Sequence, residues 1–296
     1  MDRNGRADVT EVPYRAAAGA PPGAEVLDFP GLLARARGHG LDPYAPKRPA
    51  FHELITVKSG TLRASVDFAE YELTAGDWLW VRPGQVHHYD SDLTAARGTV
   101  VLFLPGFLST ATVAAAGVDR PAAPNPLTPA GAHADAVGRV RDLLEDEYRR
   151  LGDLPLQVHI DVVRHLLSVL VLRLAHGRRE PDGAVTGSEA FRRFQQAVER
   201  DFARTHRVED YARDLGYSVR TLTRATRAAA GCGAKRFIDD RVLLEAKRLL
   251  VHTELSSHVI GDRLGFPDAT VFTKFFRQRA GETPAAFRTR ARGARP

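Results

Sequence analysis

The sequence predicts an α+β protein in which a small antiparallel β-barrel or sandwich is followed by a helical segment and an all-helical C-terminal domain. Short apolar runs broken by turns occupy residues 26–105, and helical periodicity takes over after a Pro/Ala-rich connector at 120–132. Two similar helical units then recur near the C-terminus. With 296 residues, the chain is long enough for two domains that each bury a core.

The charge of the chain is distributed unevenly between its two parts. Up to Gly187 there are 20 basic and 23 acidic residues, and from Ser188 onward there are 22 basic and 13 acidic residues. The net charge is therefore −3 in the first part and +9 in the second. A general abundance of arginine explains part of the excess but not the asymmetry. A basic domain beside a mildly acidic one is typical of a nucleic-acid-binding protein.

Cysteine content and hydropathy indicate where the protein works. The single cysteine, Cys232, can form no internal disulfide and no CxxC metal or redox motif, so we expect a reducing compartment. No apolar run reaches the roughly 18 residues of a membrane span, and the N-terminal MDRNGRADVT lacks the apolar core of a signal peptide. The sequence therefore predicts a cytoplasmic protein with no membrane partner and no cofactor.

Composition divides the chain into five segments. Residues 1–24 are rich in Ala, Gly and Pro and are expected to form a loose tail. Residues 25–119 carry the β pattern, with β-branched and aromatic residues between repeated glycines, and residues 120–176 are expected to be mainly helical. The segment GRREPDGAVTGS at 177–188 is a linker by composition, and residues 189–290 form the basic helical domain.

The second helix before the linker has an unusually wide apolar surface. In PLQVHIDVVRHLLSVLVLRLAHG, one face at helical spacing carries Leu156, Ile160, Val163, Leu167, Leu170 and Leu174. This face either forms the core of its own domain or pairs with a second subunit. We expect residues 120–176 to act as a dimerisation segment, so the predicted assembly is a homodimer.

The C-terminal domain contains the same helical unit twice. ARDLGYSVRTLTRATRAAAG is followed 49 residues later by GDRLGFPDATVFTKFFRQRAG, with Gly216 matching Gly265 and Leu222 matching Phe272. Each copy has a short helix, a turn at glycine, a capping residue (Ser218 or Asp268) and a second helix. This is the pattern of a helix-turn-helix, and two copies in near register are far more specific than one.

The outer face of each second helix carries groups suited to DNA. If the helix DRVLLEAKRLLVHTE holds the two copies about 34 Å apart, both second helices can enter successive major grooves. Any one of these residues could instead belong to a solvated helix face, but the set favours double-stranded promoter DNA as the partner. The candidate DNA-binding residues are Arg220, Thr223, Arg224, Arg227, Ala269, Thr270, Thr273, Lys274 and Arg277.

The C-terminal 100 residues resemble a known family. The run AKRLLVHTELSSHVIGDRLGFPDATVFTKFFRQRAGETPAAFR is similar to the signature of AraC/XylS-type transcription regulators, over residues 191–288. The resemblance implies that the groove is faced by Arg220, Thr223, Arg224, Ala269, Thr270, Thr273 and Lys274. It also has departures, because Thr226 stands where the family usually has a large apolar residue and Gly261 replaces a common alanine.

Two short motifs of the N-terminal domain, FHELITVKSG and GDWLWVRPGQVHHY, resemble those of the cupin barrel, with Glu53 and His87 at metal-ligand positions. Cupin barrels occur in metal-dependent enzymes and in sensor domains of AraC-type regulators. The paired histidines of the first motif are replaced by Lys47 and Pro49, or by Pro46 and Arg48. Since catalytic metal sites usually keep three protein ligands, a cupin enzyme fused to a DNA-binding module is the alternative and a sensor without a metal is preferred.

We therefore expect a non-enzymatic, sequence-specific transcription regulator controlled by a small-molecule effector. The effector would change the relative placement of two DNA-binding domains in a dimer, and RNA polymerase is a further candidate partner. Trp78 and Trp80 alternate to one face of a strand, so they either line the effector site or belong to the core. The candidate effector-binding residues are Glu53, Trp78, Trp80, His87 and Tyr89.

Overall fold

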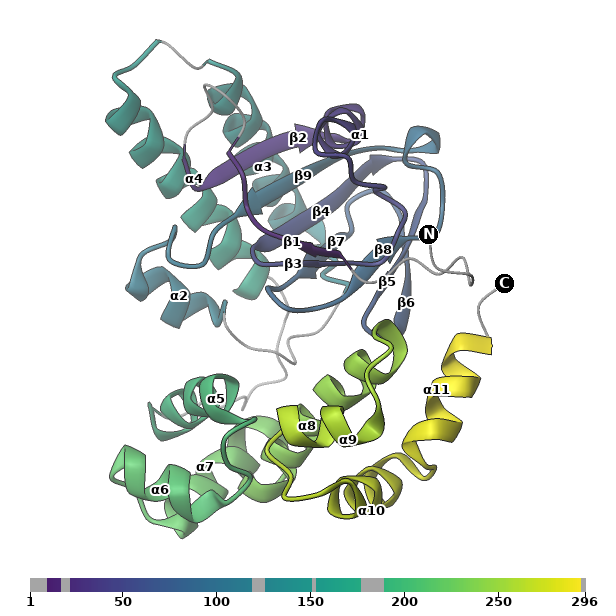
Figure 1. Ribbon diagram of the computed structural model, residues 1–296. Coiled ribbons are helices and arrows are strands. Elements are labelled where there is room, and N and C mark those ends of the chain that lie inside the picture. The colour runs from purple at the N-terminus through teal and green to yellow at the C-terminus, as the bar shows by residue number, and fades with distance from the viewer. Residues whose placement is uncertain (1–9, 17–21, 119–125, 151–152, 177–188, 294–296) are drawn as a thin grey trace. The chain divides into compact units, whose positions relative to one another are not determined.

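The computed structural model describes residues 10–16, 22–118, 126–150, 153–176 and 189–293. The chain divides into two compact units, Met1–Arg179 and Glu180–Pro296, and each is described by itself (Figure 1). The linker expected at 177–188 and residues 120–125 of the expected connector lie outside the described ranges. Within those ranges, no helix combines the length and the apolar character needed to cross a membrane.

The first unit contains two β-sheets. One sheet has the order β1 (Thr10–Val12), β3 (Lys47–Pro49), β8 (His87–Tyr89), β5 (Leu62–Val66) and β6 (Ala69–Leu73). The other has the order β2 (Ala24–Asp28), β9 (Arg97–Phe103), β4 (His52–Ser59) and β7 (Trp78–Val81). The pairs are antiparallel except β1 with β3. The described strands do not close into one barrel, so of the two expected forms the structure has the sandwich.

Strand β1 differs from the sequence prediction. It lies inside the segment expected to be a loose tail, yet Thr10–Val12 pairs with Lys47–Pro49 and Val12 is buried. Three residues are too few to show the alternation by which a strand is recognised in a sequence. Pairing with a distant strand therefore orders a segment whose local composition favours no regular structure.

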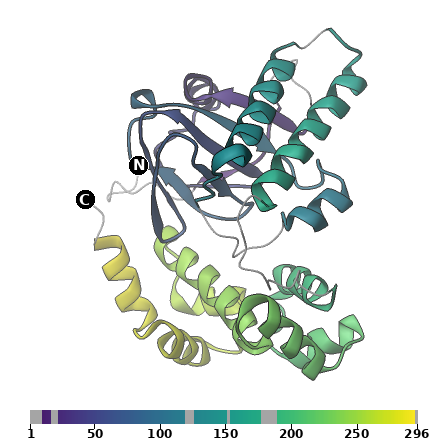
Figure 2. The same cartoon turned by 180° about the vertical axis from the view of Figure 1, so that it is seen from behind.

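The central strand β4 faces two separate cores because successive side chains point to opposite sides. Ile55 and Val57 face the other sheet, whereas Leu54 faces the helices α3 (Gly131–Arg149) and α4 (Leu156–His176). Figure 2 shows these two helices side by side over the sheet. Of the apolar face predicted on α4, the five residues from Ile160 to Leu174 are buried in this core, and Leu156 is 56% exposed. The domain core, not a second subunit, therefore covers most of that face.

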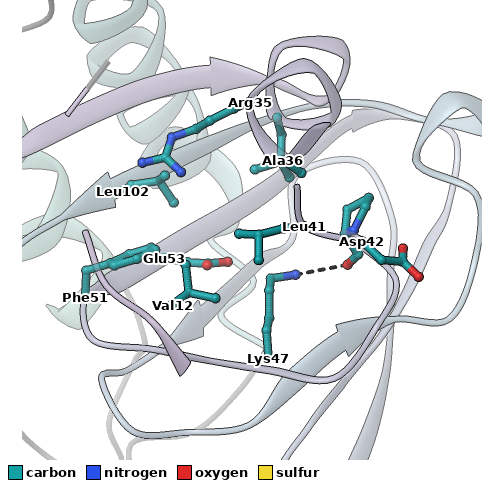
Figure 3. Close-up of a pocket in the computed structure, with 11 residues that line it drawn as sticks. Val12, Arg35, Ala36, Leu41, Asp42, Lys47, Phe51, Glu53 and Leu102 are labelled. Atoms are coloured by element: carbon teal, nitrogen blue, oxygen red, sulfur yellow. Dashed lines mark hydrogen bonds between the residues drawn. The ribbon is translucent and has the colours of Figure 1, made fainter. Parts of the chain in front are cut away.

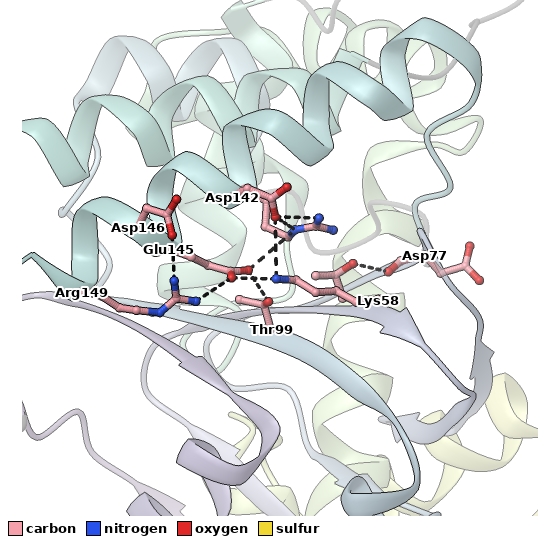
Figure 4. Close-up of polar contacts among 9 residues, drawn as sticks. Lys58, Asp77, Thr99, Asp142, Glu145, Asp146 and Arg149 are labelled. Carbon is pink, nitrogen blue, oxygen red and sulfur yellow. Dashed lines mark hydrogen bonds and ion pairs between the residues drawn. The ribbon is translucent and has the colours of Figure 1, made fainter.

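Helix α3 is tied to the sheet by a buried carboxylate (Figure 4). Glu145 accepts hydrogen bonds from the Thr99 hydroxyl on β9 at 2.5 Å and from the Lys58 ammonium on β4 at 2.7 Å. Arg149, one turn further along α3, donates to the same carboxylate at 3.2 Å. Charge-assisted bonds of this kind hold the helical hairpin at one place on the two strands. Two further helices, α1 (Phe29–Gly38) and α2 (Thr110–Ala116), complete the unit.

The second unit is entirely helical in its described part. Its elements are α5 (Glu189–Asp201), α6 (Val208–Leu215), α7 (Val219–Ala230), α8 (Ala234–His252), α9 (Ser257–Arg263), α10 (Ala269–Ala280) and α11 (Pro284–Gly293). The side chains of Ser218 and Asp268 cap α7 and α10. One core runs through both helix pairs and the long helix α8, from Phe194 through Val242 to Phe276. Helix α8 is thus the common support for α6–α7 and α9–α10.

Candidate DNA interface and effector cavity

Helix α7 presents three arginines on its outer side. Arg220, Arg224 and Arg227 are exposed and Thr223 is half-buried, whereas Leu222 and Thr226 are fully buried against the unit. The Thr226 hydroxyl donates to the Leu222 carbonyl at 2.7 Å, so this polar group in the core is satisfied within the helix. The helix therefore has a strict division between an inner face and a cationic outer face.

Helix α10 repeats this division with different side chains. Phe272 and Phe276 are fully buried, and Thr270, Lys274 and Arg277 are exposed. Ala269 and Thr273 are half-buried beside them. All nine predicted DNA-binding residues thus lie on the two second helices, with none of them fully buried.

The cations on these two faces differ from most arginines of the unit because no carboxylate is paired with them. In the described part of the chain, none of Arg220, Arg224, Arg227, Lys274 and Arg277 forms an ion pair. Elsewhere, Arg213 pairs with Asp210 at 3.3 Å, and Arg204 pairs with Asp214 at 3.2 Å. Unpaired cations along a helix are available to neutralise phosphates, whereas paired ones must first lose their partner.

Ionic contacts with the buried carboxylate of Asp239 fix α10 on α8. Asp239 is 2% exposed and accepts from Arg279 of α10 and from Lys235 of its own helix. At the other side of α8, Arg241 donates to Glu199 of α5 at 2.8 Å and lies over the Phe202 ring at 3.9 Å. The support helix is therefore bonded to elements of both halves of the unit.

A second contact joins the two helix-turn-helix copies directly: residues 203–206, before the first copy, meet the turn at Leu264–Phe266 of the second. We call this contact the 203–206 brace. The turn of the second helix-turn-helix meets the loop that precedes the first one, with His206 Nε2 donating to the Leu264 carbonyl at 2.7 Å. The His206 ring also packs on Phe266, with centroids 4.6 Å apart. Gly265 has φ +79, and a Cβ there would lie 2.2 Å from the Ala203 carbonyl oxygen. Only glycine allows this approach.

An exposed apolar side chain on α10 was not among the predicted DNA-binding residues. Val271 is 42% exposed on α10, next to Thr270 in the chain and one turn from Lys274. An exposed apolar β-branched side chain on a helix that enters the major groove can contact a thymine methyl group. In the sequence, Val271 could have been noticed because it is the third residue of a helix that is predicted to contact DNA.

Three of the predicted effector residues gather in the interior of the first unit. Glu53 and His87 are 3% and 0% exposed, and their Oε2 and Nε2 atoms lie 3.0 Å apart. The His87 ring meets the Tyr89 ring edge-on at 5.7 Å. Lys47 of β3 pairs with His87 of β8 and places its ammonium 4.5 Å from the centre of the Tyr89 ring. We call Lys47, Glu53, His87 and Tyr89 the interior polar cluster.

A small cavity of about 30 Å³ adjoins this cluster (Figure 3). Its polar lining consists of Lys47, Glu53, Arg35 of α1 and Asp42, and its apolar lining includes Val12 and Phe51. Sequence reasoning found Glu53 but missed Arg35 and Lys47 as lining residues. The signal for Lys47 was its position in place of a cupin metal-ligand histidine.

The other two predicted effector residues lie elsewhere. Trp78 and Trp80 point to the helix-facing side of β7 and belong to the core under α3 and α4. Trp80 donates its indole N–H to His52 Nδ1 at 3.2 Å. The prediction that they line the same interior as Glu53 does not fit this placement, because Glu53 pairs with Val81 and so faces the opposite side of the sheet. The core alternative accounts for both tryptophans.

The donor set of the interior does not fit a cupin metal. Within the described ranges, no three His, Cys, Asp or Glu side chains converge as metal ligands. Glu53 and His87 are the two that meet in this interior, and the neighbouring position is taken by Lys47; burial lowers the pKa of its ammonium, while Glu53 and Asp42 favour the charged form. A divalent ion beside that ammonium would be repelled, so no chemical step is derived from a metal.

Comparison with known proteins connects both units to one family. The profile of a helix-turn-helix domain matches residues 211–290, and that of the AraC-like ligand binding domain matches residues 29–161. The chain belongs to the AraC/XylS family. It is accordingly a DNA-binding transcriptional regulator with an N-terminal ligand-binding domain, as predicted from the sequence.

The chain is similar to AraC/XylS activators along most of its length. The HTH-type transcriptional activator RhaS of Salmonella schwarzengrund is 25% identical over 242 residues, which are 80% of this chain and 85% of that protein. The HTH-type transcriptional activator RhaR of an Enterobacter species is 24% identical over 262 residues, covering 85% of this chain and 89% of its own.

Two solved structures can be compared with this AraC/XylS member. ToxT of Vibrio cholerae is 11% identical, with a TM-score of 0.39, and the match covers 92% of this chain and 98% of ToxT. The DNA-binding domain of AdpA in complex with a target DNA is 28% identical, with a TM-score of 0.33, covering 36% of this chain and 96% of that domain.

The two departures from the AraC/XylS pattern have local explanations. Thr226 is accommodated because its hydroxyl bonds within the helix. At Gly261, a Cβ would lie 3.1 Å from the Cβ of Phe272, so glycine lets the bulky phenylalanine of α10 approach α9 closely. Neither departure disturbs the helix-turn-helix geometry.

Proposed function

We propose that this regulator binds promoter DNA through the outer faces of α7 and α10 in the cytoplasm, as a homodimer, and under the control of a small molecule held in the first unit. The observation that carries the DNA assignment is the set of five unpaired cations on two like helices, in a unit whose other arginines are largely ion-paired. Phosphate neutralisation is assigned to Arg227 and Arg277. Base reading is assigned to the residues that the family resemblance places toward the groove: Arg220, Thr223, Arg224, Ala269, Thr270, Thr273 and Lys274.

Substitution of Arg224 tests this assignment. Arg224→Ala is expected to cost on the order of 1–3 kcal/mol of binding on a cognate site and much less on random DNA. Arg213→Ala is the matched control, because Arg213 is also exposed but is paired with Asp210 on α6. Gel-shift titration measures the affinity for a cognate site, taken from a genome-wide binding map, and for random DNA. Equal losses on the two DNAs would reduce Arg224 to a phosphate contact.

The proposed homodimer forms through the outward side of α4. A stripe at heptad spacing runs along this side, with Val158 and Val169 at 46% and 41% exposure. Its members, three or four residues apart, are Val158, Val162, His165, Val169, Leu172 and His176. Such spacing is that of a two-helix seam, in which the same stripe on a second copy is a suitable partner.

Charge placed in this stripe is expected to prevent dimerisation. The double variant Val158→Glu/Val169→Glu should be a monomer by size-exclusion chromatography with light scattering, whereas the wild type and Glu70→Lys on strand β6 should be dimers. A dimeric double variant would place the interface elsewhere.

No observation favours the alternative of a metal-dependent enzyme, because the interior supplies two metal-ligand side chains next to a lysine. Stoichiometric iron, manganese or zinc in the purified protein would revive it. We propose instead that the bound effector alters the relative placement of the two DNA-binding domains and so the recruitment of RNA polymerase. This requires a different effector affinity in the two arrangements.

A further inference from the structure

The interior polar cluster contains buried atoms whose hydrogen-bonding capacity is unused. Glu53 Oε2 and His87 Nε2 contact each other at 3.0 Å, whereas His87 Nδ1 and the Tyr89 hydroxyl have no hydrogen-bond partner among the described residues. Buried polar groups are normally paired, and leaving one unpaired costs about 1–3 kcal/mol. Of the interior polar cluster, Lys47 and Glu53 line the cavity, so an occupant of the cavity can complete the bonding of these two side chains.

Lys47 also has bonding capacity to spare. Its ammonium donates to the Pro43 carbonyl at 3.0 Å, which uses one of its three N–H groups. The Arg35 guanidinium, on the other side of the cavity, uses Nε and one terminal nitrogen on Glu25 and on the Arg15 carbonyl. Each cation therefore has at least one N–H group that makes no hydrogen bond with the described residues, and Figure 3 shows both side chains in the cavity lining with Glu53.

The interior charges around the cavity are balanced in pairs, and the further lining carboxylate, Asp42, is exposed to solvent. Arg35 is neutralised by Glu25, which is 1% exposed, and Lys47 faces Glu53. Burial opposes ionisation of Glu53, but the His87 imidazole and the Lys47 ammonium hold its pKa below the ordinary value, so it remains a carboxylate. An occupant with a net charge would leave one buried charge uncompensated, which costs several kcal/mol.

We propose that this cavity takes a small zwitterion of the amino-acid type, with its carboxylate on Lys47 and its ammonium group on Glu53. In the described structure Glu53 contacts His87 and the Lys47 ammonium donates to the Pro43 carbonyl, so the two form no ion pair with each other; the ligand supplies each with a partner of opposite charge and adds no net charge. Hydrogen bonds between charged partners are about twice as strong as those of neutral hydroxyls, so the site favours a zwitterion over an uncharged sugar. The inference rests on the proposed effector function and specifies its ligand class.

The cavity must widen to admit such a ligand, since about 30 Å³ accommodates only a few water molecules. Val12, which forms part of the lining, belongs to the three-residue strand β1 at the edge of its sheet. An edge strand of this length is held by few backbone hydrogen bonds, so its displacement is the least costly way to enlarge the space.

Calorimetric titration of the full-length dimer with the common α-amino acids tests the proposal. For the amino acid that binds best, two analogues are matched to it: the carboxylic acid without the amine and the amine without the carboxylate. Each analogue is expected to bind at least about tenfold more weakly, since each lacks one charge-assisted contact. Equal binding of either analogue, or binding of no amino acid, overturns the proposal.

Variants connect the binding to the cluster. Lys47→Met and Glu53→Gln should each weaken binding by about tenfold or more, while Arg63→Met on β5 and Glu70→Gln on β6, which remove exposed charges, should leave it unchanged. Circular dichroism verifies that each variant folds, and Glu53→Gln serves if Lys47→Met does not. Unchanged binding by a folded Lys47→Met or Glu53→Gln overturns the assignment.

The same titrations separate this inference from the proposed function. If a sugar or an organic acid binds and alters DNA affinity while every amino acid fails, the effector function stands and the zwitterion class falls. If an amino acid binds at the cluster without any effect on DNA affinity, the ligand class stands and effector control falls.

Discussion

The two helix-turn-helix copies have the same topology but are held by different forces. Helix α7 faces the core with Leu222 and Thr226, whereas α10 faces it with two phenylalanines, Phe272 and Phe276. The second copy is further bonded through Arg279 to Asp239, through the 203–206 brace, and through Arg288 of α11, which donates to the Leu250 and Leu255 carbonyls. The first copy has fewer such contacts and three free arginines.

This difference indicates a division of roles within one reading surface. Aromatic burial and interhelix bonds make the second copy a rigid reference on α8. The first copy combines a smaller core with three free cations on its second helix, against two on α10, which suits it to phosphate contact and small adjustments on the DNA. Duplication of a motif in one chain thus allows stiffness and charge to be optimised separately.

The largest expected effect is on the aromatic core of the second copy. Phe276→Ala should lower the free energy of unfolding of the second unit by about 3–5 kcal/mol, because a fully buried ring is replaced by a cavity. Thr226→Ala, at the matching place in the first copy, should cost only about 1 kcal/mol. Hydrogen exchange of the α6–α10 amides in full-length protein measures both, and similar losses would contradict the proposed division.

The next effect concerns the 203–206 brace. Gly216 and Gly265 both have positive φ, so alanine at either should cost about 1–2 kcal/mol. At Gly265 the added Cβ also meets the Ala203 carbonyl, and overpacking adds about 1–3 kcal/mol, whereas Gly216 has open space. Gly265→Ala should therefore be the more destabilising by chemical denaturation. It should also weaken binding to a two-site DNA more than to a half-site, and an equal loss on both would show that the brace does not set spacing.

A smaller effect is expected at the helix starts. Asp268 accepts from the backbone N–H groups of Thr270 and Val271, both at 2.8 Å, while Ser218 accepts only from Thr221 at 3.0 Å. Removal of a cap costs about 0.5–2 kcal/mol, so Asp268→Ala should lie at the upper end of this range and Ser218→Ala at the lower. Exchange protection of the first turn of each helix measures the difference, and the reverse order would show that capping is not stronger in the second copy.

The smallest effect is the pH dependence of the brace. Burial lowers the pKa of His206 below its ordinary value of about 6.5, so the unfolded chain binds the proton more readily than the folded one. Stability is therefore complete above about pH 6.5 and decreases as the pH falls through the window down to the folded pKa. His206→Gln retains an N–H donor for the Leu264 carbonyl but has no group that titrates in this range. The variant should therefore lose less stability than the wild type as the pH falls. The free energy of unfolding of the wild type and of His206→Gln is measured at each pH. A difference between the two proteins that does not change with pH would contradict this prediction.

Much of the second unit could be predicted because its determinants are local. Ser218 and Asp268 cap helices where expected, and glycine follows the helices at Gly216 and Gly231 with positive φ. The 3.6-residue spacing of Leu222 with Thr226 and of Phe272 with Phe276 determines which face is buried. The outer faces follow by elimination, although the residues that contact DNA remain a prediction.

The features that escaped prediction depend on contacts between distant segments. Strand β1 exists only by pairing with β3, and Trp78 and Trp80 could be placed on one face but not on the correct side of the sheet. The bonding of His206 to Leu264 joins residues 58 apart in the chain. Lys47 reads as a missing metal ligand in the sequence, and only the fold shows that its ammonium stands beside Glu53 and Tyr89.

The position of the two tryptophans has a practical consequence. Trp78 and Trp80 are the only tryptophans of the chain, and both are buried between β7 and the α3–α4 hairpin. Their intrinsic emission therefore monitors how the hairpin is seated on the sheet and is blind to the DNA-binding unit. If a small molecule that binds in the cavity shifts the tryptophan emission, its binding also changes the packing on the opposite side of the sheet.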